Sequence, residues 1–207
     1  MSKKPITNKD VTPRMFESDF LEFFSKVHFS VPLIVFIPII SYFIYQSLWI
    51  EKSDIKHFLF WILAGLAVWT LTEYVLHRFI FHFTPRSALM ERIHFIFHGV
   101  HHDYPNDSKR LVMPPAASIP LAALFYFLFL IIFGSNIAPM FAGFLIGYLW
   151  YDMTHYAIHH FNMHSAFWLA IKNHHMKHHF QNPEKGFGVS TPIWDYVWQT
   201  MFPAKNK

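Results

Sequence analysis

The sequence contains no cysteine and few charged residues. Its 207 residues are 53% hydrophobic, 20% aromatic and only 14% charged. The absence of cysteine excludes disulfide bonds and thiolate metal sites. The scarcity of charge favours a membrane protein over a soluble one. The length suits one domain, and we expect no nucleic-acid partner.

Four apolar runs predict an all-α integral membrane protein with four transmembrane helices. Residues 31–50 contain no charge over twenty positions, which at helical rise spans about 30 Å, the thickness of a bilayer core. The expected spans are 31–50, 57–76, 117–133 and 137–157. Residues 1–30 form the first predicted unit, and residues 31–207 the second. The residues that follow Pro13 are expected to form a short amphipathic helix on the membrane surface.

The distribution of positive charge predicts the orientation. Of the 17 Lys and Arg residues, five lie in the first 30 residues, five in the central loop and five in the C-terminal region. Only Lys52 and Lys56 lie on the other side of the predicted spans. Because positive charge gathers on the cytoplasmic side, both termini and the central loop should be cytoplasmic. Two hairpins that enter the bilayer without crossing it are the alternative.

Histidine is abundant and clustered. The sequence has 16 His against 13 Asp plus Glu. Two stretches have the spacing H-x-x-H-H, and two looser pairs have the spacings H-x4-H and H-x3-H. Because positions i, i+3 and i+4 share one helix face, three imidazoles at these positions can converge on one point. The ten clustered residues are His77, His82, His98, His101, His102, His155, His159, His175, His178 and His179.

Ten imidazoles in this pattern indicate a metal centre. Neutral imidazole suits zinc, copper, iron and nickel. Ten ligands exceed the four to six that one ion takes, so two ions are expected. A paired site at a membrane surface fits redox chemistry with O2 better than a structural role. Metal storage or transport is the alternative, although transporters place their ligands near the bilayer midplane.

The remaining histidines lie outside the repeated spacings. His28 and His57 are expected to be surface residues, and His164 and His174 to lie at the surface or behind the ligands. The roles of His94 and His160 are left open, although His94 precedes His98 by one helical turn and could join its face.

Two acids lie close to the clusters. Glu73 precedes His77 by four residues, and Asp152 precedes His155 by three. Metal-bound imidazole normally donates its outer N–H to a carboxylate or carbonyl. Both acids are therefore candidates for that role, with surface carboxylates as the alternative.

The clusters, in this order between pairs of spans, resemble those of the membrane fatty acid hydroxylase and sterol desaturase superfamily. Elements outside the metal motif are similar to the fatty acid 2-hydroxylase branch and argue against its alternatives, such as a sterol C4-methyl oxidase or a carotenoid hydroxylase. The resemblance covers about residues 57–202. The segments that carry it are Glu73–His82, His98–Pro105, Arg110–Pro115, Tyr151–His160, His175–His179, Gly186–Ser190 and Trp194–Asp195.

This resemblance implies a dimetal centre held by the ten clustered histidines in a cytoplasmic helical cap. Iron is the expected active metal, and zinc can occupy such sites in purified protein. The implied reaction is hydroxylation of the α-carbon of a fatty acid or sphingolipid acyl chain with O2 and two electrons. Because the histidine ligands are expected at the membrane surface, attack on a carbon near the polar head of the lipid is also favoured. Phe180, Phe187, Trp194 and Trp198 are expected to line the route of the acyl chain or to form an interfacial belt.

The electron donor is expected to be a separate protein. Eukaryotic relatives often carry an N-terminal cytochrome b5 domain with a His-Pro-Gly-Gly haem motif, which the first 30 residues lack. A cytochrome b5-like protein, a ferredoxin or a reductase would supply the electrons. The compact form favours a bacterial inner-membrane protein over one of the endoplasmic reticulum.

Overall fold

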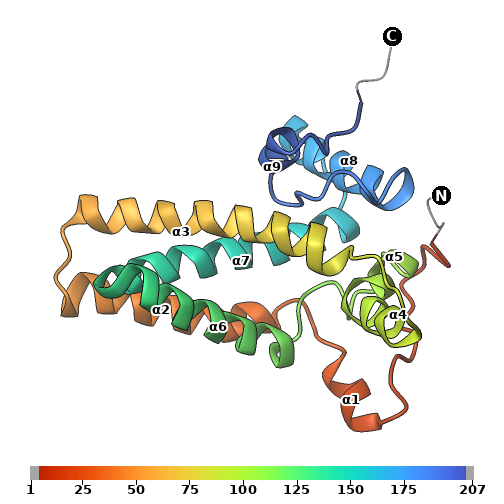
Figure 1. Ribbon diagram of the computed structural model, residues 1–207, viewed down its shortest axis with the longest axis horizontal. Helices are drawn as coiled ribbons and strands as arrows, with labels where there is room; N and C mark the ends of the chain where they lie inside the picture. Colours follow the sequence, from red (N-terminus) through yellow and green to blue (C-terminus); the bar gives the residue numbers. More distant parts are fainter. Residues whose placement is uncertain (1–4, 204–207) are drawn as a thin grey trace.

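The computed structural model describes residues 5–203, and its regular elements are helical. Four long helices form a bundle, and the other helices gather at one of its ends (Figure 1). The long helices of the bundle are α2 (Val31–Tyr45), α3 (Ile55–Val75), α6 (Pro115–Phe133) and α7 (Ile137–His160). The helices outside the bundle are α1 (Asp19–Phe24), α4 (Ala88–His94), α5 (Val100–Asp103), α8 (Ala166–Phe180) and α9 (Ile193–Val197). We call α4, α5, α8 and α9, with their connections, the cap.

Three segments of the described chain are long and apolar enough to cross a membrane. They are Val31–Ile50, Ile55–Phe81 and Pro115–His160. The third contains both α6 and α7, which fold back on each other at the turn Gly134–Asn136. Gly134 has a φ of 54°, which favours glycine. The predicted runs therefore coincide with the four long helices, and the chain is an integral membrane protein.

Helix α7 lies at the centre of the bundle. Most of its residues are buried, and it packs against α2, α3 and α6. Gly65 of α3 and Gly143 of α7 allow the two backbones to touch, since a β-carbon on either would lie 2.1 Å from a carbonyl oxygen of the other helix. The outer helices turn large apolar residues outward, such as Ile131, which is 83% exposed. A bilayer would cover that surface.

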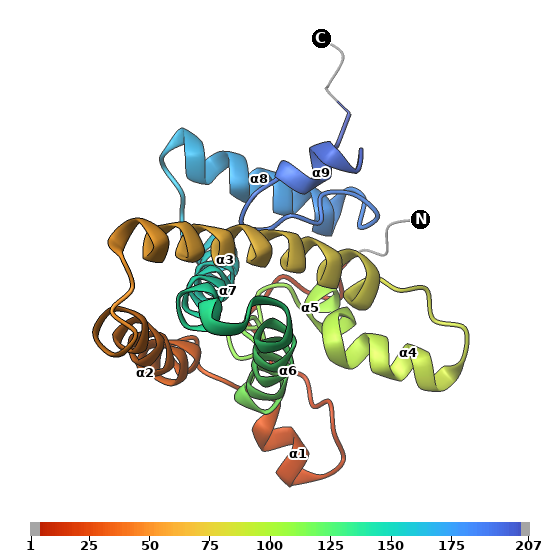
Figure 2. The ribbon, with the colours of Figure 1, turned by 60° about the vertical axis from the view of Figure 1, so that its left-hand side comes forward.

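Polar side chains define where the helices begin. Asp54 accepts hydrogen bonds from the backbone N–H of Lys56 and His57 and so caps α3. Ser165 caps α8 in the same way through the N–H of Trp168. These caps fix where the two helices start. Helix α8 lies on the side of α3 away from α2 and α6 (Figure 2).

The N-terminal segment, residues 5–30, packs against the cap. Its predicted amphipathic helix is shorter than the apolar pattern suggested and occupies only α1. The segment is held by Arg110, whose buried guanidinium contacts Glu22 at 2.8 Å. Burial would raise the pKa of Glu22, but hydrogen bonds from Lys26 and from the N–H of Met15 and Phe16, together with Arg110, lower it to about 2. Glu22 is therefore an ionised anchor between this segment and the cap.

Candidate metal centre

The structure brings all ten clustered histidines together at the cap end of the bundle. They form two groups of five, and within each group one nitrogen of every imidazole lies within 4.8 Å of the others. The two sets draw on α7, α8 and the segments around α4 and α5. We call them the His77 group, made of His77, His82, His98, His102 and His178, and the His175 group, made of His101, His155, His159, His175 and His179.

The triplets divide between the groups, although a shared helix face would allow each triplet to converge on one point. His98 and His102 belong to the His77 group, whereas His101 belongs to the His175 group. His178 and His179 likewise separate. The reason is helical geometry: successive residues point about 100° apart, so adjacent histidines face different centres. Positions i and i+4 differ by only about 40° and stay together.

The H-x4-H pair depends on a local departure from α-helical winding. The chain continues from α3 as a π-helical turn over Leu76–Phe81, and the N–H of His82 donates to the carbonyl of His77 at 3.1 Å. In this wider turn, residues five apart lie above one another. His77 and His82 can therefore serve one group. A second π-helical turn, Phe95–Gly99, carries His98 between α4 and α5.

The imidazole contacts fit metal ligands better than a hydrogen-bond network. The Nε2 atom of His175 lies 3.0–3.1 Å from the Nε2 atoms of His155, His159 and His179. A neutral imidazole carries one N–H and cannot bond three neighbours with it. Converging lone pairs are what a metal ion requires, so each group can hold one ion.

Burial keeps the cap imidazoles neutral, as metal binding requires. It lowers the pKa of His102 to about 3, with repulsion from neighbouring imidazoles as the next cause. The pKa values of His175, His178 and His179 are lowered well below the usual value for the same two reasons. These nitrogens therefore present lone pairs at neutral pH.

The other histidines lie outside both groups. His28 is exposed and contacts Ser30, and His57 contacts Asn136 and Trp61 near the opposite end of the bundle. His164 is exposed. His94 packs its ring on Phe83, His160 stacks on Tyr156, and His174 contacts the carboxylate of Asp195 at 3.0 Å.

Neither predicted acid bonds directly to an imidazole of the groups. Glu73 is buried and accepts hydrogen bonds from the N–H groups of Val189 and Ser190 and from the Ser190 hydroxyl. Asp152 is also buried: its Oδ1 accepts from the N–H of Met113 at 3.4 Å, and its carboxylate lies next to the Tyr148 hydroxyl, one turn earlier on α7. Both acids lie on the predicted helices, but the backbone N–H groups that they accept from belong to distant segments, which spacing could not reveal.

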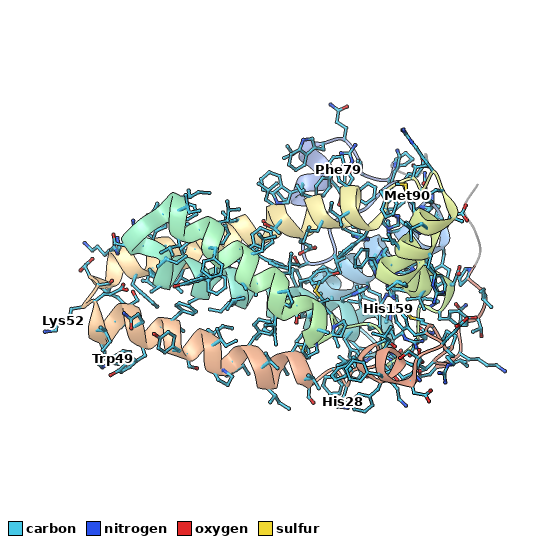
Figure 3. All side chains as sticks on the ribbon, turned by 60° about the horizontal axis from the view of Figure 1, so that its bottom comes forward. His28, Trp49, Lys52, Phe79, Met90 and His159 are labelled. Carbon is cyan, nitrogen blue, oxygen red and sulfur yellow. The ribbon has the colours of Figure 1, made fainter. Side chains whose placement is uncertain are left out.

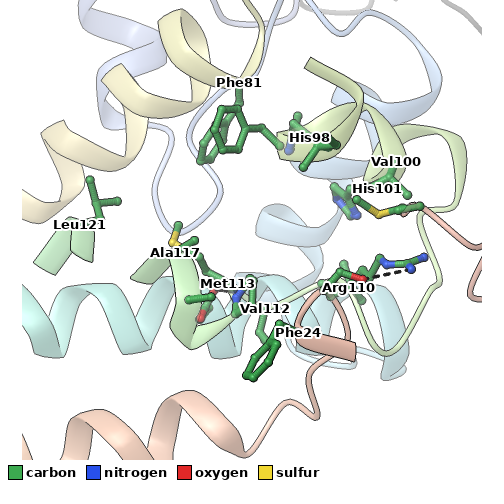
Figure 4. A pocket seen from close by; sticks show the side chains of 18 of the residues that line it. Phe24, Phe81, His98, Val100, His101, Arg110, Val112, Met113, Ala117 and Leu121 are labelled. Atoms are coloured by element: carbon green, nitrogen blue, oxygen red, sulfur yellow. Dashed lines mark hydrogen bonds between the residues drawn. The ribbon is translucent and has the colours of Figure 1, made fainter. Parts of the chain in front are cut away.

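An apolar cavity of about 600 Å³ adjoins both groups (Figure 4). His98 of the His77 group and His101 and His155 of the His175 group line it, together with Asp152. The remaining lining is mainly apolar and comes from the N-terminal segment, the two π-helical turns, residues 110–114 and the start of α6. The cavity is large enough for a small-molecule or lipid ligand.

The four aromatic residues expected along the acyl route do not line this cavity. Phe187 packs against His77, His82 and His178 instead. Trp194 donates to Thr70, Trp198 stacks on Tyr74, and Phe180 is 46% exposed. The lining arises from segments distant in sequence, including the N-terminal segment, which no local pattern assigns to a cavity.

Comparisons with known proteins agree with this geometry. The family model described as "Fatty acid hydroxylase" matches residues 62–200. The fatty acid 2-hydroxylase of Rattus norvegicus is 39% identical and aligns with 93% of this chain and 57% of its own length. The dihydroceramide fatty acyl 2-hydroxylase FAH1 of Arabidopsis thaliana is 36% identical over 98% of this chain and 85% of its own. This chain therefore spans little more than half the length of the mammalian relative.

A solved structure also matches. It is described as "Full length scs7p (only hydroxylase domain visible)", and it superposes with a TM-score of 0.84 at 36% identity. The match covers 91% of this chain and 72% of the other. The similarity in sequence and in fold extends across the bundle and the cap.

Proposed function

This chain belongs to the fatty acid hydroxylase family, and from that premise we propose that it hydroxylates carbon two of a lipid acyl chain with O2 and two electrons. The observation that carries the proposal is the position of the two histidine groups. Members of both groups line one apolar cavity at the end of a membrane bundle. Relatives named as 2-hydroxylases support this reaction over those of other superfamily branches.

In this proposal the ten histidines hold two ions, with iron as the active metal and zinc as a possible occupant. Imidazole suits either metal. When bound, the iron pair would supply the activation of O2 that breaking a C–H bond requires. The chain's own part is to hold ten neutral imidazoles in two separate sets and to keep the site largely apolar. The non-enzymatic alternative, storage or transport, does not require a cavity lined by both groups.

The cavity would orient the lipid. Apolar side chains that line the cavity, such as Leu76, Ile80 and Leu121, would contact the acyl tail and exclude water from it. The name of the dihydroceramide fatty acyl 2-hydroxylase of Arabidopsis thaliana supports an acyl amide of the sphingolipid type as substrate, beside a free fatty acid.

The position of attack can be tested with isotopes. Cells that express the protein and are fed a fatty acid fully deuterated at carbon two should yield a hydroxylated product that has lost one deuterium. The physical reason is that the α-carbon bond is the one broken. Lipid mass spectrometry measures the label. An acid deuterated only at carbon three is the matched control and should keep its label, whereas a product retaining both carbon-two deuteriums would place the chemistry elsewhere.

The electrons require a partner. A separate cytochrome b5-like protein, a ferredoxin or a reductase remains our prediction for the donor. The predicted bacterial inner membrane also remains a prediction, and the relatives described above come from a rat and a plant.

The proposed topology has four crossings, with both termini, the cap and the cavity on the cytoplasmic side. Lys52 and Trp49 lie at the end of the bundle opposite His159 (Figure 3). In the sequence, fifteen Lys and Arg lie outside the short loop that joins the first two predicted spans and only two lie within it, which supports this orientation. The exposed rings of Phe20 and Phe23 on α1, which are 70% and 72% exposed, suit insertion into the lipid headgroup region.

Cysteine labelling tests this orientation, because the chain has no native cysteine. Lys109→Cys places a thiol in the cap, and Glu51→Cys places one at the opposite end; both positions are exposed. In spheroplasts of an expressing bacterium, an impermeant maleimide should label Glu51→Cys at once and Lys109→Cys only after permeabilisation. The reverse pattern would contradict the proposed topology.

A further inference from the structure

The segment of residues 185–190, which we call the cap turn, contacts the buried carboxylates of Glu73 and Asp195 and the imidazoles of His77 and His178. Its four backbone N–H groups from Phe187 to Ser190 all point at carboxylates. Asp195 accepts from the first two at 2.9 Å each. Glu73 accepts from the next two at 2.6 and 2.8 Å. Both carboxylates are almost completely buried, so these bonds fix the position of the turn.

The carbonyl groups of the same turn point at imidazoles. The Phe187 carbonyl accepts from Nδ1 of His77 at 2.5 Å, and the Lys185 carbonyl accepts from Nδ1 of His178 at 2.8 Å. These bonds place the protons of both rings on Nδ1 and leave Nε2 as the ligand atom. The turn thus selects the tautomer of two members of the His77 group.

One peptide unit joins the Asp195 carboxylate to His77. The Phe187 carbonyl and the Gly188 N–H belong to the same peptide, so Asp195 polarises from one side the group that His77 bonds on the other. Burial alone would raise the pKa of Asp195, but hydrogen bonds from His174, Thr200 and Gly188 lower it, so the carboxylate stays charged. A carbonyl acceptor polarised by a charged carboxylate makes the imidazole a stronger base and a better ligand.

The His175 group makes no comparable set of bonds to the cap turn. His155 lies next to the backbone of Leu111, which is outside that turn. The Nδ1 atoms of His159, His175 and His179 are buried and have no hydrogen-bond partner among residues 5–203, so no acceptor fixes the proton on these three rings. The two groups therefore have the same ligand chemistry but different surroundings.

We infer that the cap turn makes the two metal sites unequal: the His77 group releases its ion more slowly than the His175 group, and Asp195 and Glu73 are the positioning residues responsible. This inference rests on the metal centre of the proposed function. It concerns ion binding rather than hydroxylation, so it can be tested without substrate or electron donor.

Zinc release from the purified full-length chain tests the inference. The zinc-loaded protein, mixed with an excess of a coloured chelator, should lose two ions in two phases of equal amplitude. His179→Ala removes a ligand of the His175 group and should abolish the fast phase while leaving the slow one. Asp195→Asn should accelerate the slow phase by about tenfold, as expected for loss of an outer partner of a ligand, and leave the fast phase unchanged.

A matched control comes from the N-terminal segment. Glu22 is another buried carboxylate that accepts two backbone N–H groups, from Met15 and Phe16, but it does not contact the cap turn. Glu22→Gln should leave both release rates unchanged. Should Asp195→Asn fail to fold, Ser190→Ala removes only the hydroxyl bond to Glu73 and should accelerate the slow phase to a smaller extent.

Three outcomes would overturn the inference. A single release rate for both ions of the wild type would show that the sites are equal. Equal acceleration of both phases in Asp195→Asn or Ser190→Ala would show only a general loss of stability. A wild-type chain that retains no zinc after loading would overturn the metal centre itself, which is a different result from equal release rates. Failure to find a hydroxylated product in cells would contradict the proposed reaction but would not change the two phases of zinc release.

Discussion

Replacement of His101 or His178 by alanine is expected to lower hydroxylation by more than about 100-fold. Loss of a hydrogen-bond partner behind a metal ligand already lowers metal affinity or activity by about 10–100-fold, and loss of the ligand itself should lower activity further. The two residues belong to different groups, and the Nε2 atom of each lies within 3.0 Å of another imidazole nitrogen. Lipid mass spectrometry of expressing cells measures the product, and elemental analysis of the purified variants counts the ions.

Alanine variants at adjacent histidines should lose different metal ions. His101→Ala should lose the ion of the His175 group, and His102→Ala that of the His77 group, although the residues are adjacent. His28→Ala is the control and should behave as wild type, because His28 is exposed and outside both groups. Activity close to wild type in His101→Ala and His178→Ala would contradict the assignment of these residues as ligands.

Gly65→Leu is expected to destabilise the bundle by about 3 kcal/mol or more, at the upper end of the usual cost of overpacking. The first atom of the new side chain would lie 2.1 Å from the carbonyl oxygen of Met140 and 2.7 Å from the backbone nitrogen of Phe144. Backbone atoms of a neighbouring helix cannot rotate away as a side chain can, so α3 and α7 must separate. Thermal unfolding in detergent should show a Tm lower by about 6–12 °C.

The same substitution should reduce activity, since α3 leads into His77 and α7 carries His155 and His159. Ala67→Leu provides the comparison: it lies two residues further along α3, is exposed, and would add the same side chain to the lipid-facing side. We expect this variant to keep the wild-type Tm within about 2 °C. Equal Tm values for the two variants would mean that the glycine contact does not hold the helices together.

Hydrophobicity and histidine spacing together predicted the helices of the bundle and the ten residues that form the two groups. These features depend on composition within a window of about twenty residues, which a sequence displays directly. The division of the triplets between the two groups could not be predicted, because sharing a broad helix face is a weaker condition than pointing at one atom. The π-helical turn at Leu76–Phe81 could not be predicted, since no residue in it demands five-residue winding.

The hydrogen-bond partners and the cavity walls around the two histidine groups could not be predicted from short stretches of sequence, for a different reason. Glu73 finds its partners 116 and 117 positions further along the chain, and Phe187 contributes a backbone carbonyl, which every residue possesses. The N-terminal segment forms one wall of the cavity through residues such as Met15 and Phe24. Only the tertiary fold brings such atoms together, so they carry no signature in the spacing of residues.

The division of His178 and His179 between the two groups has a consequence for how the protein matures. These two residues are the last of the ten to be synthesised, and each completes a different group. When translation reaches Asn173, the His77 group has four of its members and the His175 group only three. Because α8 supplies the remaining imidazoles, neither full set exists until that helix has left the ribosome and packed onto the bundle. In the proposed metal centre, loading of the ions would therefore follow membrane insertion of the long helices, and a chain interrupted before α8 would leave both sets of imidazoles incomplete.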